Sequence, residues 1–355
     1  MEKAHMPEES EDNRDNGGSA EVQTVAAVVI GRNEGQRLAR CLESIELARG
    51  TTVNELIYVD SASTDGSPEL ASQYGATVIV VHPERPTAAI GRNAGWLHAT
   101  SELILFLDGD TLLNPDFLPA ACHALRQRQS VAAVWGHRRE IHPEASVYNR
   151  VLDLDWMYPP GLTEFCGGDV LMRRSALLET GGFDETLIAG EEPELCRRLR
   201  ARGYGILHID QPMTGHDLQI SSWGQYWKRA TRAGHAYAEV SQRFKNSEDP
   251  LWMVDRRRNL LRGSLWILLF AAAIAASAKF GFLPGALWLA LLLMLSLRSA
   301  WKARWKGAKP WVLLIYGFHS HLQQVPILIG QLQYELSKRR GRRQKLIEYK
   351  ETNAG

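Results

Sequence analysis

The sequence predicts an α/β domain with a mostly parallel β-sheet between two layers of helices, followed by a membrane-associated helical hairpin. Short apolar runs alternate with amphipathic segments over the first two thirds of the 355 residues, which is the pattern of a parallel sheet covered by helices. Polar loops rich in Asp follow several of these runs. After residue 262 a long apolar stretch lies between two basic segments, as in membrane anchors.

The two ends of the chain differ in charge, although 41 basic and 40 acidic residues almost balance overall. Residues 1–21 are polar and acidic without apolar periodicity, so we predict a disordered tail. This segment lacks the basic-then-apolar order of a secretory signal, and we expect it to stay in the cytoplasm. Residues 337–355 form a basic tail that we expect on anionic lipid. Nucleic acid is not expected as a partner, because no basic folded face with interleaved aromatic residues accompanies the tail.

The four cysteines do not suggest covalent cross-links or a zinc site. They are widely spaced and contain no C-x-x-C pair: Cys41, Cys122, Cys166 and Cys196. We therefore expect reduced, partly buried thiols.

The domain begins with four strands, each followed by a polar loop. The predicted strands are residues 25–30, 56–59, 76–81 and 103–107, separated by helices over residues 38–47, from Ser67 onward, and over residues 91–100. The carboxyl ends of parallel strands meet at one edge of a sheet, where ligands bind. One crevice is therefore expected to be lined by Asn33, Glu34, Asp60, Asp65, Asp108 and Asp110.

The fourth strand ends in two carboxylates. Five large apolar residues are followed by Asp108-Gly109-Asp110, and side chains two apart on a regular strand point the same way. Such a pair can form a binding site for a hard divalent cation, which prefers oxygen ligands. The motif alone would also fit a polar turn before the next helix.

Four ordered motifs together resemble a known family. They are Val29-Ile-Gly-Arg-Asn33-Glu34, Tyr58-Val-Asp60-Ser-Ala-Ser-Thr-Asp65-Gly66-Ser, Gly91-Arg-Asn93-Ala-Gly95 and Leu107-Asp108-Gly-Asp110-Thr111. In this order they resemble a family-2 glycosyltransferase of the GT-A fold, a three-layer α/β/α sandwich, in its membrane-anchored bacterial type. The likeness covers roughly residues 24–235, and an ordered set is more specific than one motif. The absence of G-x-G-x-x-G argues against a Rossmann dehydrogenase.

The resemblance implies roles for the residues of the donor side. A nucleotide-sugar, UDP- or GDP-linked, is expected beside Asn33 and Glu34, with Asp60 contacting the base or ribose. Asp108 and Asp110 are expected to hold Mg²⁺ or Mn²⁺ against the diphosphate, where the cation neutralises charge on the departing nucleotide. From the residues alone, Asp65 is expected to form a turn. Arg92 could reach a phosphate, but an exposed arginine at a helix start is the preferred interpretation.

The resemblance also implies an acceptor side. Gly168 and Asp169 match the family's Gly-rich segment beside the sugar, and Glu191-Glu192 match its acidic pair, whose second member, Glu192, would be the general base. A carboxylate neighbour and burial would raise the pKa of this weak base. The same acids also fit an ordinary helix start.

Residues further along the chain have two possible interpretations each. His216 matches a further metal ligand of some family members and is equally compatible with a structural histidine. Lys228 stands where a processive member would have Arg, so transfer of one or few sugars is expected. Arg229 and Arg232 would close over the diphosphate or, by default, form a solvated basic helix face.

The C-terminal third predicts membrane attachment. Residues 263–282 and 283–297 are apolar apart from Lys279 and are divided by Gly281 and Pro284, which predicts a hairpin over residues 263–297. Its basic flanks place both ends on the cytoplasmic side. Residues 311–336 are apolar but interrupted by polar side chains, so interfacial or re-entrant helices are expected.

The expected organisation is a tail over residues 1–21, a GT-A domain over residues 22–245, a membrane region over residues 250–336 and a basic tail over residues 337–355. The expected function is metal-dependent, inverting sugar transfer to a lipid-linked, cell-envelope or polysaccharide acceptor. The enzyme would lie at the cytoplasmic inner membrane, with the catalytic domain facing the cytoplasm. A non-catalytic membrane scaffold with this fold and a sugar nucleotidyltransferase are the alternatives.

Overall fold

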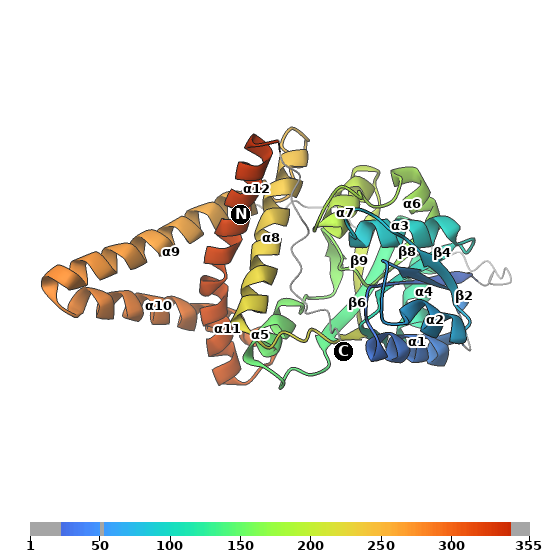
Figure 1. Cartoon of the computed structure of the whole chain (residues 1–355), viewed down its shortest axis with the longest axis horizontal. Coiled ribbons are helices and arrows are strands. Elements are labelled where there is room, and N and C mark those ends of the chain that lie inside the picture. The colour runs from blue at the N-terminus through green and yellow to red at the C-terminus, as the bar shows by residue number, and fades with distance from the viewer. Residues whose placement is uncertain (1–22, 50–52, 342–355) are drawn as a thin grey trace, which may run out of the picture.

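The computed structural model describes residues 23–49 and 53–341. Figure 1 shows an α/β domain on one side, helix α8 and the segment α11–α12 in the middle, and the long hairpin α9–α10 extending away from the domain. The predicted acidic tail over residues 1–21 and most of the basic tail lie outside the described residues.

The described part of the domain contains one nine-stranded sheet in the order β3-β2-β1-β4-β8-β6-β9-β5, with β7 paired to β9. The strands are β1 (Val25–Gly31), β2 (Val53–Asp60), β3 (Thr77–Val80), β4 (Leu103–Asp108), β5 (Thr111–Leu113), β6 (Val131–Glu140), β7 (Gly161–Thr163), β8 (Val170–Arg173) and β9 (Gly205–His216). The first four strands are parallel, and β6 is parallel to β9. The sheet is mixed because β8 runs against both β4 and β6.

Helices cover both faces of the sheet, which confirms the predicted α/β fold. They are α1 (Gln36–Arg49), α2 (Ser67–Gln73), α3 (Ala88–His98), α4 (Phe117–Gln127), α5 (Val147–Asp155), α6 (Arg174–Thr180), α7 (Glu191–Ala201) and α8 (Trp223–Arg243). In Figure 1, α3, α6 and α7 lie above the sheet and α1 and α2 below it. The middle strand β4 is buried on both faces from Leu103 to Leu107, as its unbroken apolar run predicts. Burial ends at Asp108, where the site begins.

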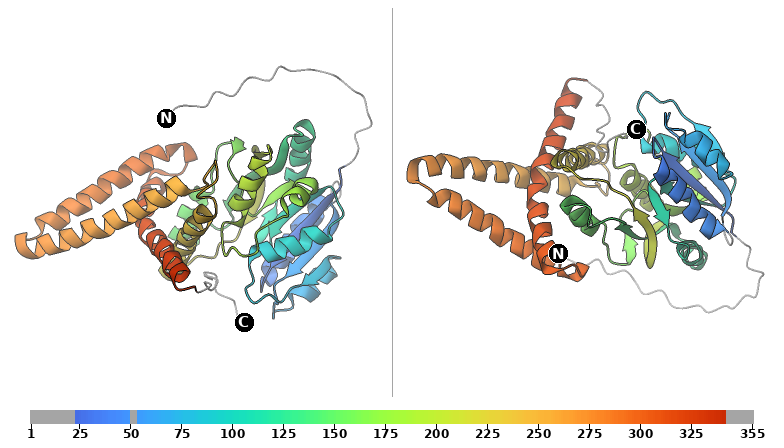
Figure 2. Two further views of the ribbon diagram at one scale, coloured as in Figure 1. Left: turned by 90° about the horizontal axis from the view of Figure 1, so that it is seen from above. Right: turned by 60° about the horizontal axis from the view of Figure 1, so that its bottom comes forward.

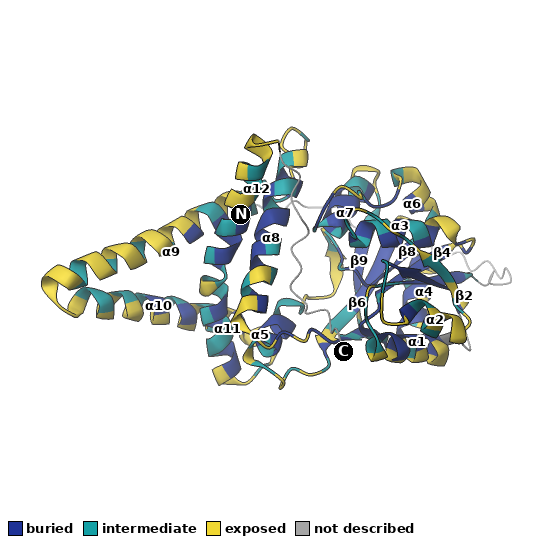
Figure 3. Ribbon diagram, in the orientation of Figure 1, coloured by how far each residue is buried: buried dark blue, intermediate teal, exposed yellow. Residues whose placement is uncertain are grey.

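Up to residue 341, the last one described, the C-terminal part consists of four helices, α9 (Met253–Phe280), α10 (Leu283–Lys302), α11 (Pro310–Leu322) and α12 (Gln324–Arg339), with a short 3₁₀ turn at Arg304–Lys306. Among the described residues, three segments are long and apolar enough to cross a membrane: Met253–Phe280, Leu283–Lys302 and Pro310–Arg339. Only 6% and 11% of the first two are buried in the protein, against 44% of the third. Figure 3 shows the same contrast, with the hairpin mostly exposed.

Helix α8 belongs to both parts of the molecule. It packs closely along α12 (Figures 1 and 2). Glycines allow this approach: a Cβ atom on Gly234 would lie 2.0 Å from the Ile327 carbonyl oxygen, and one on Gly330 would lie 2.0 Å from the Thr231 carbonyl oxygen. The face of α8 opposite α12 turns toward the sheet. The segment α11–α12 lies across the base of the hairpin (Figure 1) and packs on α8, which connects it to the α/β domain.

Candidate active site

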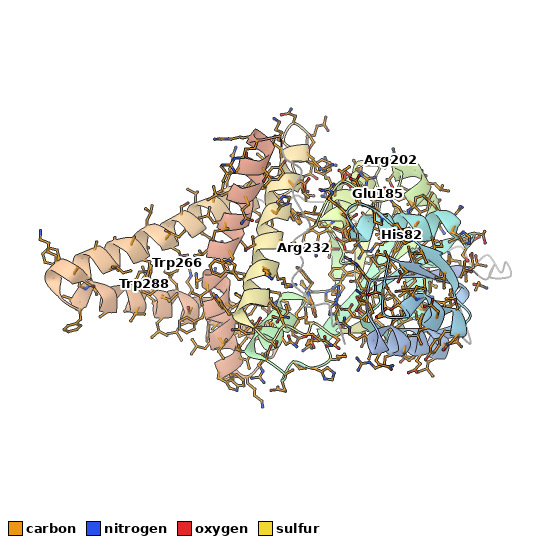
Figure 4. All side chains as sticks on the ribbon, viewed as in Figure 1. His82, Glu185, Arg202, Arg232, Trp266 and Trp288 are labelled. Atoms are coloured by element: carbon orange, nitrogen blue, oxygen red, sulfur yellow. The ribbon has the colours of Figure 1, made fainter. Side chains whose placement is uncertain are left out.

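A cavity of about 590 Å³ opens at the carboxyl ends of β1 and β4. Its walls come from the loops after these strands, from the start of α7 and from α8. Figure 4 labels Arg232, which reaches from α8 toward the sheet. The predicted crevice at the strand ends is therefore present, and α8 closes it from the membrane-helix side.

Asp108, Asp110 and His216 come together in this cavity. One ligand atom of each lies within 4.8 Å of the others, and His216 Nε2 is 3.4 Å from Asp110 Oδ1. The pairing of β5 with β9 places Thr111 opposite His216, which explains how residues so far apart in sequence meet. The structure thus joins the Asp-Gly-Asp motif to the histidine that sequence reasoning left open.

The donor set fits a divalent cation. Burial, aided by the positive charge of Arg138, holds the pKa of His216 well below its usual value, so the ring is neutral near pH 7 and can offer a lone pair. Its Nδ1 atom is buried and has no hydrogen-bond partner within the described residues. Two carboxylates and one neutral imidazole suit Mg²⁺ or Mn²⁺.

Arg92 joins the cation side of the cavity to the start of α7. Its side chain is 2% exposed, and its guanidinium lies 3.0 Å from Asp108 Oδ1, 3.0 Å from Glu191 Oε1 and 3.1 Å from Glu192 Oε1. The prediction of an exposed helix-start arginine is therefore wrong. Helix α3 packs on the sheet and directs this side chain beneath the loops. No local sequence signal reveals it, because its partners are remote along the chain.

Gly168 makes room for this guanidinium. A Cβ atom at Gly168 would lie 2.3 Å from Arg92 Nη2 and 3.1 Å from Glu192 Oε1. The glycine predicted beside the sugar thus has a clear structural reason, which is the close approach of Arg92. Gly167 next to it is less confined, since a Cβ atom there would meet only Arg138 Nη1, at 3.9 Å.

Asp169 lies behind Asp108 and is buried. It accepts hydrogen bonds from the Thr214 hydroxyl at 2.7 Å and from the Asp108 amide at 3.2 Å. Burial raises its pKa, against the effect of Arg138, whose Nε is 3.5 Å away. These contacts place Asp169 as a support for Asp108.

The acidic pair lies at the first turn of α7. Glu191 is buried and Glu192 lies in the cavity wall with 16% of its side chain exposed. Burial first and the negative charge of Glu191 second raise the pKa of Glu192 to about 7, against the lowering effect of Arg92. A carboxylate with this pKa is well matched to proton transfer near neutral pH.

Hydrogen bonds join the loop after β1 to the loop after β2. Asn33 adopts a positive φ of 54°, its amide donates to Ser63 Oγ at 2.9 Å, and its side-chain oxygen accepts from the Thr64 amide at 2.8 Å. Glu34 lines the cavity and pairs with Arg37 at 2.8 Å. Asn33 and Glu34 are therefore where sequence reasoning placed them, at the cavity rim.

Asp60 and Asp65 hold loops. Asp60 is fully buried and accepts hydrogen bonds from the Tyr58 hydroxyl at 3.0 Å and the Ser63 amide at 2.7 Å. It is absent from the cavity wall, where Ser61 takes its place. Asp65 accepts hydrogen bonds from Ser67, which is the predicted turn. Neither carboxylate lines the cavity, contrary to the prediction, because each is used to hold its own loop.

Besides Arg92, further arginines line the cavity, among them Arg138, Arg229 and Arg232. Arg138 lies 3.5 Å from Asp108 Oδ2, and its guanidinium lies 4.8 Å from the Trp156 ring centre. Arg229 and Arg232 of α8 also line the cavity. Both residues are half-buried, and Arg232 donates to the Ile188 carbonyl oxygen at 2.9 Å, so they form part of the cavity wall and not the solvated helix face expected by default. Their spacing of three on an amphipathic helix was the available signal.

Comparisons with known proteins place the chain in a family. A profile described as Glycosyl transferase family 2 matches residues 26–180. EpsE of Bacillus subtilis, which carries the name of a glycosyltransferase, is 30% identical over 203 residues, covering 54% of this chain and 69% of EpsE. The chain therefore belongs to glycosyltransferase family 2, as the ordered motifs indicate.

Two further relatives differ in how much of their length is matched. The pre-mycofactocin glycosyltransferase of Mycobacterium tuberculosis is 27% identical over 213 residues, covering 56% of this chain and 44% of that protein. The chain thus spans less than half of that relative. A mannosyltransferase from Pyrobaculum calidifontis, solved in complex with GDP-Man and Mn²⁺, superposes with a TM-score of 0.62 at 23% identity, over 90% of this chain and 89% of that one. This likeness confirms the GT-A fold.

We expect Gly168→Ala to impair the site more than Gly167→Ala. The added methyl group at residue 168 displaces Arg92, whereas the one at residue 167 meets an ordinary contact. Misplacing a reacting group by about 1 Å can cost on the order of 10²-fold in rate. Turnover of a nucleotide-sugar and the thermal unfolding midpoint should be measured for both variants. Equal activity of the two would contradict the role given to Gly168.

Proposed function

We propose that this enzyme is an inverting, cation-dependent glycosyltransferase that moves a sugar from a nucleoside diphosphate donor to a lipid-linked or polysaccharide acceptor at a membrane. The observation that carries the proposal is the Arg92 network, which places the carboxylate pair Glu191–Glu192 beside Asp108 within one cavity. Such a transfer requires a cation-binding site and, in the same cavity, a general base whose pKa lies near neutral pH.

Asp108, Asp110 and His216 would hold Mg²⁺ or Mn²⁺ in this proposal. The bound cation would supply positive charge that neutralises the departing nucleoside diphosphate. Arg229 and Arg232 contribute further positive charge from the opposite wall of the same cavity. The diphosphate therefore has a cationic pocket between the β4 end and α8, and Arg138 adds to it beside Asp108.

Glu192 is proposed as the general base. It lines the cavity, and its raised pKa lets it accept a proton from an acceptor hydroxyl while remaining largely ionised slightly above neutral pH. Arg92 holds the carboxylate in place, and Glu191 keeps its pKa high. A base on one side and a leaving nucleotide on the other is the arrangement of an inverting displacement.

The nucleoside is proposed to lie against the loops after β1 and β2. Asn33 braces the two loops, and Glu34 and Ser61 line the cavity there. Asp60 would act beneath them by fixing the Ser63 amide, so that a direct contact with base or ribose requires the loop to open. UDP and GDP donors are both compatible with these groups.

The apolar hairpin is proposed to enter a membrane from the cytoplasmic side. Its helices α9 and α10 are exposed along their length (Figure 3), and Trp266 packs against Trp288 between them (Figure 4). Arginine and lysine residues flank the hairpin at its base, where basic groups favour the cytoplasmic face. The segment α11–α12 lies across this base, which suits an interfacial position better than a third span.

The acceptor is proposed to reach the cavity from this interface. Helix α8 contacts α12 on one side and presents Arg229 and Arg232 to the cavity on the other. An acceptor carried by a lipid would thus arrive beside the base without leaving the membrane surface. The expected location is the cytoplasmic membrane, with the catalytic domain on the cytoplasmic side.

The donor and the cation site can be tested together. Full-length protein in lipid nanodiscs should release nucleoside diphosphate from one member of a panel of UDP- and GDP-sugars, and chelation should abolish the release. Asp110→Asn removes a ligand charge and should reduce turnover to background. Asp210→Asn is the matched control, because Asp210 is a highly exposed carboxylate on the same strand as His216. Full activity in Asp110→Asn, or after chelation, would contradict the proposal.

The base can be tested by its pH dependence. In the wild-type enzyme kcat/KM should fall as the pH drops through about 7, because a protonated Glu192 cannot accept a proton. Glu192→Gln should lower transfer by about 10²–10⁴-fold and abolish this acid limb, with donor affinity nearly unchanged. Glu191→Gln should lower transfer less and move the limb to lower pH, since it removes a neighbouring negative charge. An unchanged acid limb in Glu192→Gln would assign the base elsewhere.

A further inference from the structure

A polar network joins the α/β domain to α11. Asp155, the last residue of α5, accepts a hydrogen bond from the Tyr316 hydroxyl at 3.0 Å and contacts His319 Nε2 at 3.0 Å. The other ring nitrogen of His319 lies 2.7 Å from the Tyr226 hydroxyl of α8. With Nε2 donating to Asp155, Nδ1 is left to accept from Tyr226. Both nitrogens of a buried imidazole are thus used.

Helix α5 is attached to α11 by further contacts. The guanidinium of Arg150 lies 4.6 Å from the Trp311 ring centre, and Leu154 shares a buried apolar cluster with Val312 and Leu313. Lys306, which follows α10, donates to the carbonyl oxygens of Leu154 and Met157 at the end of α5. Figure 1 shows α5 beside α11 and the lower end of α8.

The opposite side of α5 is attached to the strands of the site. Asp153 accepts two hydrogen bonds from the Arg139 guanidinium, at 2.9 and 2.8 Å, and one from the Glu140 amide at 2.8 Å. Arg139 and Glu140 follow Arg138 at the end of β6, and Glu140 is paired with His216 of β9. The helix therefore spans the distance between α11 and the two strands that carry Arg138 and His216.

Trp156 lies between the contacts of α5 with α11 and the strands that carry Arg138 and His216. It follows Asp155 directly, and its ring lies 5.1 Å from that of His216 and 4.8 Å from the Arg138 guanidinium. One side of the candidate ligand His216 therefore rests on a residue whose neighbour is anchored to α11. A displacement of α11 relative to the domain would move Trp156 and release His216.

We propose that His319 of α11 is a positioning residue for the cation site, acting through Asp155 and Trp156 on His216. The inference rests on the proposed cation-dependent function. It assigns to α11 a task beyond membrane attachment: seating of this helix sets the geometry of a ligand in the catalytic domain. Partners that orient a metal ligand typically contribute 10–100-fold to metal affinity, and an indirect partner should contribute at the low end of that range.

His321 offers a matched control on the same helix. It lies two residues from His319, and its Nε2 contacts Ser299 Oγ of α10 at 3.1 Å. Replacing it disturbs the packing of α11 against the hairpin and leaves the bonds to Asp155 intact. His319→Gln is the conservative variant, because a glutamine amide can still donate to Asp155.

The test measures Mn²⁺ binding directly, from the electron paramagnetic resonance signal of free Mn²⁺, with full-length protein in nanodiscs. His319→Ala should weaken Mn²⁺ binding by about tenfold and raise the Mn²⁺ concentration for half-maximal nucleotide release equally, with kcat at saturating Mn²⁺ within about twofold of wild type. His321→Ala should bind as the wild type does, and His319→Gln should recover most of the loss.

Three results would overturn the inference. The first is unchanged Mn²⁺ affinity in His319→Ala, which would leave the cation site standing without this link. The second is an equal loss in His321→Ala, which would attribute the effect to general packing of α11. The third is a wild-type protein that binds no Mn²⁺, which would remove the proposed cation-dependent function and the inference with it.

Discussion

The rest of the site depends on the ion network around the Arg92 guanidinium. The guanidinium group is almost fully buried and contacts the carboxylates of Asp108 at the end of β4 and of both residues of the α7 pair. Burying several carboxylates so close together is costly without a countercharge, and removing one partner of a buried pair typically costs about 3–5 kcal/mol. Arg92 supplies that countercharge. Because its nitrogen donors are held in one plane, the guanidinium also fixes the distance between the proposed cation site at Asp108 and the proposed base Glu192.

The network leaves an excess of negative charge that serves the chemistry. Burial, together with the negative charge of Glu191, raises the pKa of Glu192 to about 7, and the Arg92 guanidinium, which is shared with Asp108 and Glu191, only partly offsets this rise. Arg138 adds charge on the Asp108 side alone. The two ends of the network therefore differ: in the proposed function the β4 end would hold a cation and a diphosphate, and the α7 end would accept a proton. Gly168 lets both ends approach one guanidinium.

Much of this architecture could be predicted from the sequence, because strands, turns and helix starts leave local patterns. The apolar run of β4, the carboxylates of Asp108 and Asp110 and the acidic pair of α7 all follow from such patterns. Arg92 could not be found this way, since its partners lie 16 and 99 residues away. The inward face of α8 was hidden for a related reason. Which face of α8 turns inward depends on its packing against α12, about a hundred residues later in the chain. The sequence near Arg229 and Arg232 therefore does not show that these residues line the cavity.

In the proposed mechanism, Arg92 sets the pKa of Glu192 electrostatically as well as holding its carboxylate in place. The most direct test is the acid limb of kcat/KM against pH in Arg92→Met, which keeps the length of the side chain and removes its charge. The guanidinium lowers the pKa of Glu192, so its loss should move the limb to a pH clearly above that of the wild-type enzyme. A limb that stays at the wild-type pH would contradict the claim.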